Sequence, residues 1–138
     1  MKKTILLLVA GATNSSIKNI FGDKTHWFKK ILEECGANMQ VVEAYKGEAY
    51  DESDGDAWII TGSADSVMDN KEWMLYMENK IIKAHALKKP ILGVCFGHQI
   101  LAKALGGEVT RNPVGWEVGS HNVLLTLEGQ KTDLFKKL

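Results

Sequence analysis

The segment Ile91-Leu92-Gly93-Val94-Cys95-Phe96-Gly97-His98-Gln99 places a cysteine between two glycines, directly after a short apolar run. Such a run is typical of a buried parallel strand, and the residues from about Gly97 to Gly107 form a helical pattern that ends at two glycines. A strand, a G-x-C-x-G turn and a helix in this order predict a nucleophile elbow, whose central residue occupies a strained turn. The glycines are needed because side chains there would collide with the neighbouring strand and helix. We therefore expect Cys95 at the carboxyl edge of a sheet, where open α/β proteins bind ligands.

An elbow of this kind would give Cys95 and its neighbour two chemical roles. The Cys95 thiol could attack a carbonyl carbon, and the backbone N–H of Phe96 would point to where a tetrahedral oxyanion forms. The alternative is that Cys95 is a small buried residue at a tight turn, as free cysteines commonly are. The two glycines and the strand–helix junction favour the nucleophile. Cys35, in contrast, lies on the apolar stripe of a helix, and we expect it in the core.

Outward from the elbow, apolar runs and helical stripes alternate along the chain. Strands are expected at residues 5–10, 39–45, 56–62 and 91–94. Polar loops are expected at residues 11–22 and 46–55. One helix carries a stripe at Trp27, Phe28, Ile31, Leu32 and Cys35. A second, capped by Asp69 or Asn70, would bury Met74, Met77, Ile81 and Ala84. The alternation predicts one α/β domain over residues 1–138, with a mainly parallel open sheet and helices on both faces.

After residue 107 the pattern changes to shorter, more alternating segments. Residues 108–110 and 121–127 are expected to form two short strands joined by a glycine-rich loop, and residues 133–138 begin a helical turn.

The start of the chain permits two interpretations. Two lysines followed by the apolar residues 5–10 resemble a short signal peptide, but a buried parallel strand has the same pattern. The run is at the lower length limit for a signal, and the other strands need this one as a neighbour. We therefore expect a strand, and no other segment approaches the apolar length of a membrane span.

Composition limits the possible partners. Apolar residues make up 45% and charged residues 25%, and 17 basic side chains balance 17 acidic ones. This balance offers no basic field for nucleic acid, and no membrane contact is expected. The two cysteines do not form a disulfide framework, which suits a cytoplasmic setting. The cysteines and histidines lack metal-ligand spacing, and no phosphate-binding glycine loop occurs, so no metal and no cofactor is expected.

Residues 93–99 resemble the nucleophile motif of class I (triad-type) glutamine amidotransferases. Three further segments agree in order and spacing: residues 59–67 resemble the glycine-containing oxyanion loop, residues 101–107 the helix after the elbow, and residues 115–119 a segment typical of the stand-alone branch related to the amidotransferase domain of GMP synthase. The resemblance implies a flavodoxin-like amidotransferase fold whose carboxyl-terminal part is missing.

The resemblance also implies a role for each matching residue. Cys95 would attack the side-chain amide of glutamine, form a γ-glutamyl thioester and release ammonia. Gly62 or Ser63, together with Phe96, would donate backbone N–H groups to the oxyanion, and Gln99 would contact the substrate. His98 would have a structural role rather than act as the base. The implied partners are glutamine or a γ-glutamyl small molecule, with a synthetase partner or a homo-oligomer possible.

Two parts of such a site do not occur in this sequence. A thiol nucleophile needs an imidazole and a carboxylate that orients it, and the family supplies them from a His-x-Glu pair that this sequence lacks. The chain is therefore expected to be the amino-terminal part of a longer domain. One alternative is a non-catalytic or regulatory relative that needs a partner to complete the site. Another, a PfpI-type peptidase, is disfavoured because Phe96 stands where those proteins have a histidine.

Overall fold

The apolar run after the first lysines forms β1 (Thr4–Leu8), an inner strand of a four-stranded sheet. The computed structural model describes residues 2–135. The sheet is parallel throughout and has the order β2-β1-β3-β4, with β2 at Asn38–Val42, β3 at Ala57–Ile60 and β4 at Ile91–Gly93. The strand interpretation of residues 5–10 is thus confirmed.

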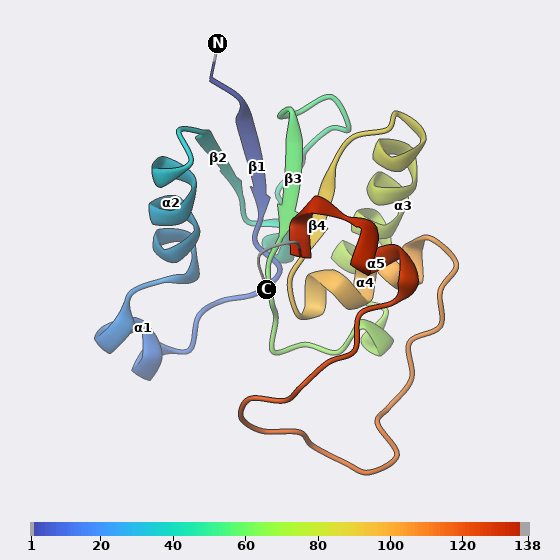
Figure 1. Cartoon of the computed structure of the whole chain (residues 1–138). Helices are drawn as coiled ribbons and strands as arrows, with labels where there is room; N and C mark the ends of the chain where they lie inside the picture. The colour runs from blue at the N-terminus through green and yellow to red at the C-terminus, as the bar shows by residue number, and fades with distance from the viewer. Residues whose placement is uncertain (1, 136–138) are drawn as a thin grey trace.

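Helices connect the strands and lie on both sides of the sheet (Figure 1). The α-helices are α1 (Ser15–Phe21), α2 (Lys24–Glu34), α3 (Glu72–Ala86), α4 (Phe96–Ala104) and α5 (Leu127–Lys131). Short 3-10 turns are η1 (Ala44–Lys46), η2 (Val67–Asp69) and η3 (Asp133–Phe135). None of the helices within residues 2–135 has the length and apolar character needed to cross a membrane.

The strand order places a topological switch point at the carboxyl edge of the sheet. β1 pairs with β2 on one side and with β3 on the other, so the connections leaving β1 and β3 turn in opposite directions. In open α/β sheets ligands bind outside the strand ends at such a switch point. The residues that follow β1, β3 and β4 therefore meet at one edge.

The main core lies between the sheet and the pair α3–α4. Leu6 and Leu8 of β1 and Trp58 and Ile60 of β3 point to this face, and all are at most 1% exposed. The two helices contribute the completely buried side chains Met74, Met77, Ile81, Ala84 and Ile100, four of which are the expected inward face of α3. The side chains of the sheet and of the two helices thus form one buried layer, which holds α3 and α4 against β3.

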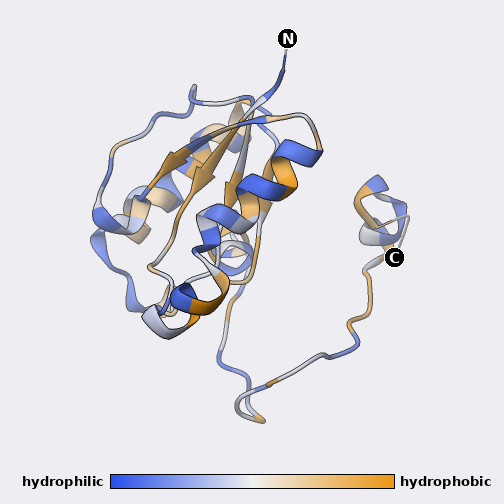
Figure 2. Ribbon diagram, turned by 90° about the vertical axis from the view of Figure 1, so that its left-hand side faces the viewer, coloured by the Kyte–Doolittle hydropathy of each residue, from blue (hydrophilic) through white to orange (hydrophobic). Residues whose placement is uncertain are grey.

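The opposite face of the sheet is covered less completely. On this face α2 covers one half of the sheet (Figure 2). Leu7 of β1 is fully buried. Toward β4 the cover ends, since Leu92 and Val94 are 40% and 39% exposed. Within α2 only Leu32 is buried.

Three expectations about the first half of the chain were wrong. The expected loop over residues 11–22 contains α1, whose first turn is capped by the Asn14 side chain accepting from the Ser16 N–H at 2.9 Å. The strand expected at residues 39–45 ends at Val42, and η1 follows it. Cys35 is exposed rather than in the core, because it lies at the end of α2, beyond the part that packs on the sheet.

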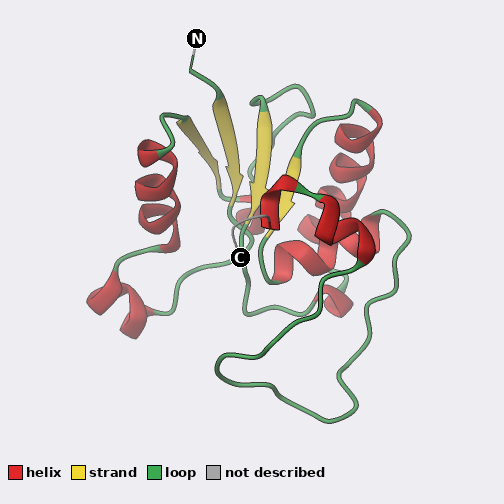
Figure 3. Ribbon diagram, in the orientation of Figure 1, coloured by secondary structure: helices red, strands yellow, loops and turns green. Residues whose placement is uncertain are grey.

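The two short strands expected at residues 108–110 and 121–127 were also wrong. Residues 108–126 run as an extended arm that leads to α5 (Figure 3), exposed except at Val109, which is partly buried against the core. Trp116 is 97% exposed and Leu124 is 100% exposed. Within residues 2–135 this segment has no partner strand, and an alternating pattern forms a strand only when it pairs. Of the expected turn at 133–138, η3 covers residues 133–135, and residues 136–138 lie outside the described part.

Candidate active site

Cys95 joins β4 to α4 in a strained turn. Its φ is 55° and its ψ is −112°, a backbone conformation that L-residues with side chains rarely adopt. The turn is held by hydrogen bonds from Val94 N–H to the Ile60 carbonyl at 3.0 Å and from Gly97 N–H to the Val94 carbonyl at 2.9 Å. The Cys95 residue is exposed. Strain of this kind clusters at functional sites.

The two glycines of the motif allow this turn to pack against its neighbours. A Cβ atom on Gly97 would collide with the Ile60 carbonyl, whose carbon would lie only 2.8 Å away. A Cβ atom on Gly93 would collide with the Gly97 carbonyl and lie 2.6 Å from the His98 nitrogen. Both contacts are with backbone atoms, which cannot rotate away as a side chain can. α4 therefore begins directly against β3 and β4.

The loop after β3 lies beside Cys95. A Cβ atom built on Gly62 would be 3.4 Å from Cys95 Cβ and 3.8 Å from its Sγ. The next residue, Ser63, accepts a hydrogen bond from the Asp65 N–H through its Oγ at 3.1 Å. The structure thus brings the Gly62–Ser63 segment, 33 positions earlier in the sequence, next to the sulfur-bearing turn.

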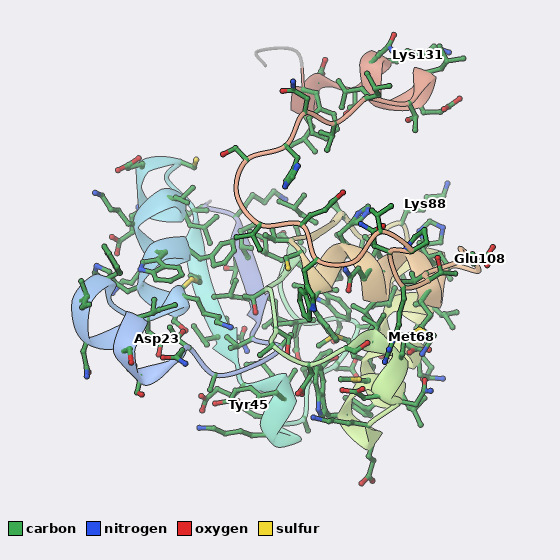
Figure 4. All side chains as sticks on the ribbon, turned by 90° about the horizontal axis from the view of Figure 1, so that it is seen from below. Asp23, Tyr45, Met68, Lys88, Glu108 and Lys131 are labelled. Atoms are coloured by element: carbon green, nitrogen blue, oxygen red, sulfur yellow. The ribbon has the colours of Figure 1, made fainter. Side chains whose placement is uncertain are left out.

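Thr61 and Lys24 hold this loop through hydrogen bonds to the Gly62 carbonyl. Thr61 is completely buried, and its Oγ1 accepts from the Ala10 N–H at 3.0 Å. The same hydroxyl donates to the Gly62 carbonyl at 3.1 Å, and Lys24 Nζ donates to that carbonyl at 3.0 Å. Burial lowers the pKa of Lys24, while its electrostatic interactions with Asp23 and Cys95 oppose this shift. Figure 4 looks at the edge where the strands end and labels Asp23, which directly precedes Lys24.

Sequence reasoning did not single out Lys24. One signal was available: the lysine is the first residue of a helix, where the positive end of the helix dipole disfavours a cation. Its partner Gly62 is 38 positions away, and no local pattern reveals such a contact.

The other expected site residues lie on α4. The Phe96 side chain is buried against Trp73, with ring centroids 5.5 Å apart, so only its backbone can face the turn. None of the described hydrogen bonds uses the Phe96 N–H. Gln99 lies one helical turn after Cys95, with an exposed side chain, and its N–H donates to the Cys95 carbonyl at 3.2 Å. Both residues therefore border the Cys95 turn.

Within residues 2–135 no imidazole is hydrogen-bonded to the Cys95 thiol. His26, His85, His98 and His121 are all exposed, and the His98 N–H donates to the Cys95 carbonyl at 3.0 Å. In the same part of the chain no group of three or more His, Cys, Asp and Glu side chains is placed to hold a metal ion.

A separate hollow of about 420 Å³ lies between η1 and α3 at the same edge of the sheet. Its lining residues include the aromatic residues Tyr45, Trp73 and Tyr76, together with Lys46 and Glu72. Neither Cys95 nor Gly62 is among its lining residues. It is therefore distinct from the Cys95 turn, although its lining residue Trp73 contacts Phe96, the residue after Cys95.

The parallel sheet, the strained cysteine turn and the adjoining glycine loop define a class of cysteine-elbow α/β proteins. A model of the class-I glutamine amidotransferase family matches residues 17–138. The chain belongs to this family.

Individual relatives agree with the family match. Gamma-glutamyl peptidase 5 of Arabidopsis thaliana is 27% identical over 133 residues, covering 94% of this chain and 53% of that protein. The glutamine-hydrolysing GMP synthase of Clostridium perfringens is 34% identical over 105 residues, covering 75% of this chain and 19% of that protein. The crystal structure of a glutamine amidotransferase from Methylobacillus flagellatus has a TM-score of 0.61 and 26% identity, covering 81% of this chain and 41% of that one.

These relatives are longer than the present chain. The chain spans about half the length of the first curated relatives that it matches, with 53%, 53% and 52% of each covered. The fold class expected from the sequence, a mainly parallel sheet between helices, is confirmed by the structure and by its structural neighbours.

Proposed function

We propose that residues 1–138 form the amino-terminal part of an amidotransferase domain that releases ammonia from the side-chain amide of glutamine or of a γ-glutamyl compound. The observation that carries the proposal is the position of the Gly62 backbone against Cys95. A nucleophile and a loop with free backbone donors, brought together from two strands, are the two parts that acyl transfer needs first.

In the proposed reaction Cys95 Sγ attacks the amide carbon and forms a carbon–sulfur bond. The N–H groups of Phe96 and of Gly62 or Ser63 stabilise the negative oxygen of the tetrahedral intermediate. Its collapse breaks the carbon–nitrogen bond and releases ammonia once the nitrogen is protonated. Water then hydrolyses the γ-glutamyl thioester and regenerates the thiol. Gln99, one turn along α4, contacts the substrate.

The proton transfers require an imidazole that the described residues do not bring to Cys95. In this proposal it comes, with its orienting carboxylate, from another segment of the natural protein or from a partner. The similarity to a gamma-glutamyl peptidase and to a glutamine-hydrolysing GMP synthase supports a γ-glutamyl substrate. A synthetase subunit or a second copy is the proposed partner. A cytoplasmic location is proposed because both cysteines are free and exposed.

A γ-glutamyl chloromethyl ketone tests the proposed nucleophile, with Cys35 as an internal control. Both thiols are exposed, so exposure alone predicts labelling of both. We expect the adduct on Cys95 at least about tenfold faster than on Cys35, since only Cys95 has the donors for the ketone oxygen. Peptide mass spectrometry over time measures both rates. Cys95→Ala should abolish the fast adduct, whereas Cys35→Ala should leave it. Equal labelling of the two thiols would overturn the proposal.

Gly62→Ala should slow the reaction of Cys95 while leaving the stability of the fold almost unchanged. The new methyl group would be in ordinary contact with the Cys95 side chain, at 3.4 and 3.8 Å, so the backbone can keep its place. It would also occupy the space through which a substrate carbonyl reaches the loop donors. We expect the ketone to react about 100-fold more slowly, the effect of a misplaced reacting group. The free energy of unfolding in urea should change by less than about 1 kcal/mol. An unchanged labelling rate would show that the loop does not face the reacting carbonyl.

A further inference from the structure

Lys24 reaches the oxyanion loop from a different part of the chain. It is the first residue of α2, and its Nζ lies 3.0 Å from the Gly62 carbonyl oxygen. Asp23, the residue before it, caps α2 and pairs with Lys18 at 3.0 Å. The Asp23 carboxylate is therefore held by Lys18, and the Lys24 ammonium is directed to the loop.

The position of Lys24 is not explained by helix stability. A cation in the first turn is opposed by the helix dipole, and partial burial of the ammonium adds a desolvation cost. α2 also carries Lys29 and Lys30, which are exposed and satisfy the same needs for solubility. The charge of the neighbouring Asp23 offsets part of these costs, and the side chain itself donates to Gly62 in the loop after β3.

The bond to Gly62 has a geometric consequence for Ser63. The Gly62 carbonyl and the Ser63 N–H belong to one planar trans peptide unit, so they point in opposite directions. Lys24 and Thr61 both donate to the carbonyl, at 3.0 and 3.1 Å, and together they fix the plane of this unit. None of the described hydrogen bonds uses the Ser63 N–H. That donor is therefore aimed by Lys24 and Thr61 and remains available for a ligand.

We propose that Lys24 is a positioning residue for the oxyanion hole, which holds the Gly62–Ser63 peptide unit so that the Ser63 N–H faces the carbonyl attacked by Cys95. This inference rests on the proposed function, because it assumes that Cys95 attacks a carbonyl group. Lys24 does not touch the substrate. It acts through the loop, and its charge adds to the positive field at the developing oxyanion.

The test compares two reactions of Cys95 in the 138-residue chain carrying Cys35→Ala. Acylation by a small thioester passes through a tetrahedral oxyanion, whereas alkylation by iodoacetamide does not. We expect Lys24→Met to slow acylation about tenfold to 100-fold, the range for weakening one oxyanion donor, and to change alkylation less than about threefold. Lys24→Arg, which can still donate to the carbonyl, should restore part of the acylation rate.

Lys29→Met is the matched control. It removes the same charge from the same helix, but Lys29 pairs only loosely with Glu33, at 3.8 Å, on the exposed side. Both of its rates should equal those of the parent chain. If Lys24→Met leaves acylation unchanged, or slows acylation and alkylation equally, the positioning role is overturned. An equal effect would mean that the charge acts on the thiol itself.

Two thioesters keep this inference separate from the proposed function. γ-Glutamyl and acetyl thioesters of the same leaving thiol are compared on each variant. If Lys24→Met slows both thioesters but the parent chain shows no preference for the γ-glutamyl one, Lys24 positions the oxyanion donor and the proposed γ-glutamyl substrate is wrong. If the parent chain prefers the γ-glutamyl thioester and Lys24→Met has no effect, the proposed function stands and the role of Lys24 does not.

Discussion

Gly97→Ala should lower the free energy of unfolding by about 3 kcal/mol, the upper part of the range for overpacking a closed interface. The added Cβ would collide with the Ile60 carbonyl, and the Ile60 carbonyl carbon and Cβ would lie 2.8 and 2.9 Å away. Ile60 is itself completely buried and accepts the Val94 N–H through the same carbonyl. Relief would require α4 to move off the sheet, which would open the core at Phe96 and Ile100.

Urea denaturation followed by circular dichroism measures this change, and Gly62→Ala is its control. Both variants add one methyl group to a glycine beside Cys95. Only the Gly97 methyl meets backbone closer than 3 Å. A Gly97→Ala variant within about 1 kcal/mol of the parent chain would show that α4 is not held as close to β3 as described.

Trp58→Ala should cost about 3–5 kcal/mol of stability, the range for removing a large aromatic side chain from a core. Trp58 is 1% exposed and packs edge-on against Tyr50 at 5.6 Å between ring centroids. Its Nε1 donates to the Asp54 carbonyl at 2.8 Å. The substitution would leave a cavity between β3 and Tyr50 and would leave the Asp54 carbonyl without this donor.

Trp116→Ala provides the contrast in the same denaturation experiment. Trp116 is 97% exposed, so its removal should change the free energy of unfolding by no more than about 0.5 kcal/mol. Trp58→Phe should fall between the two, because a smaller aromatic ring still fills part of the space and one hydrogen bond is lost, a loss of about 1 kcal/mol. A small effect of Trp58→Ala would mean that the layer between the sheet and α3 is not closely packed.

The sequence predicted most of the sheet because its signals are local. β1, β3 and β4 are short apolar runs, and the inward face of α3 follows from the spacing of Met74, Met77, Ile81 and Ala84. The helix α1 was missed although Ile17, Ile20 and Phe21 recur at helical spacing; none of its seven residues is buried, so this stripe does not mark a core-facing helix. Cys35 has the right helical spacing for a core residue, but spacing does not show where a helix leaves the sheet.

In the candidate site, too, the features that are local in sequence could be predicted and the contacts between distant segments could not. The Cys95 turn follows from a strand, two glycines and a helix that are continuous in sequence. The hydrogen bond of Lys24 to Gly62 joins segments 38 positions apart, and only the folded chain brings them together. The arm over residues 108–126 shows the opposite error. Its alternating residues suggested strands, but pairing depends on a neighbour that the described residues do not provide.

The exposed arm has a thermodynamic consequence. Between residues 114 and 124 it carries five apolar side chains that are each at least 81% exposed: Val114, Trp116, Val118, Val123 and Leu124. Any surface that covers them removes apolar area from water, which gives association a negative heat capacity change. The strength of such an association falls on cooling. A complex formed through the arm should therefore bind more weakly in the cold than at room temperature.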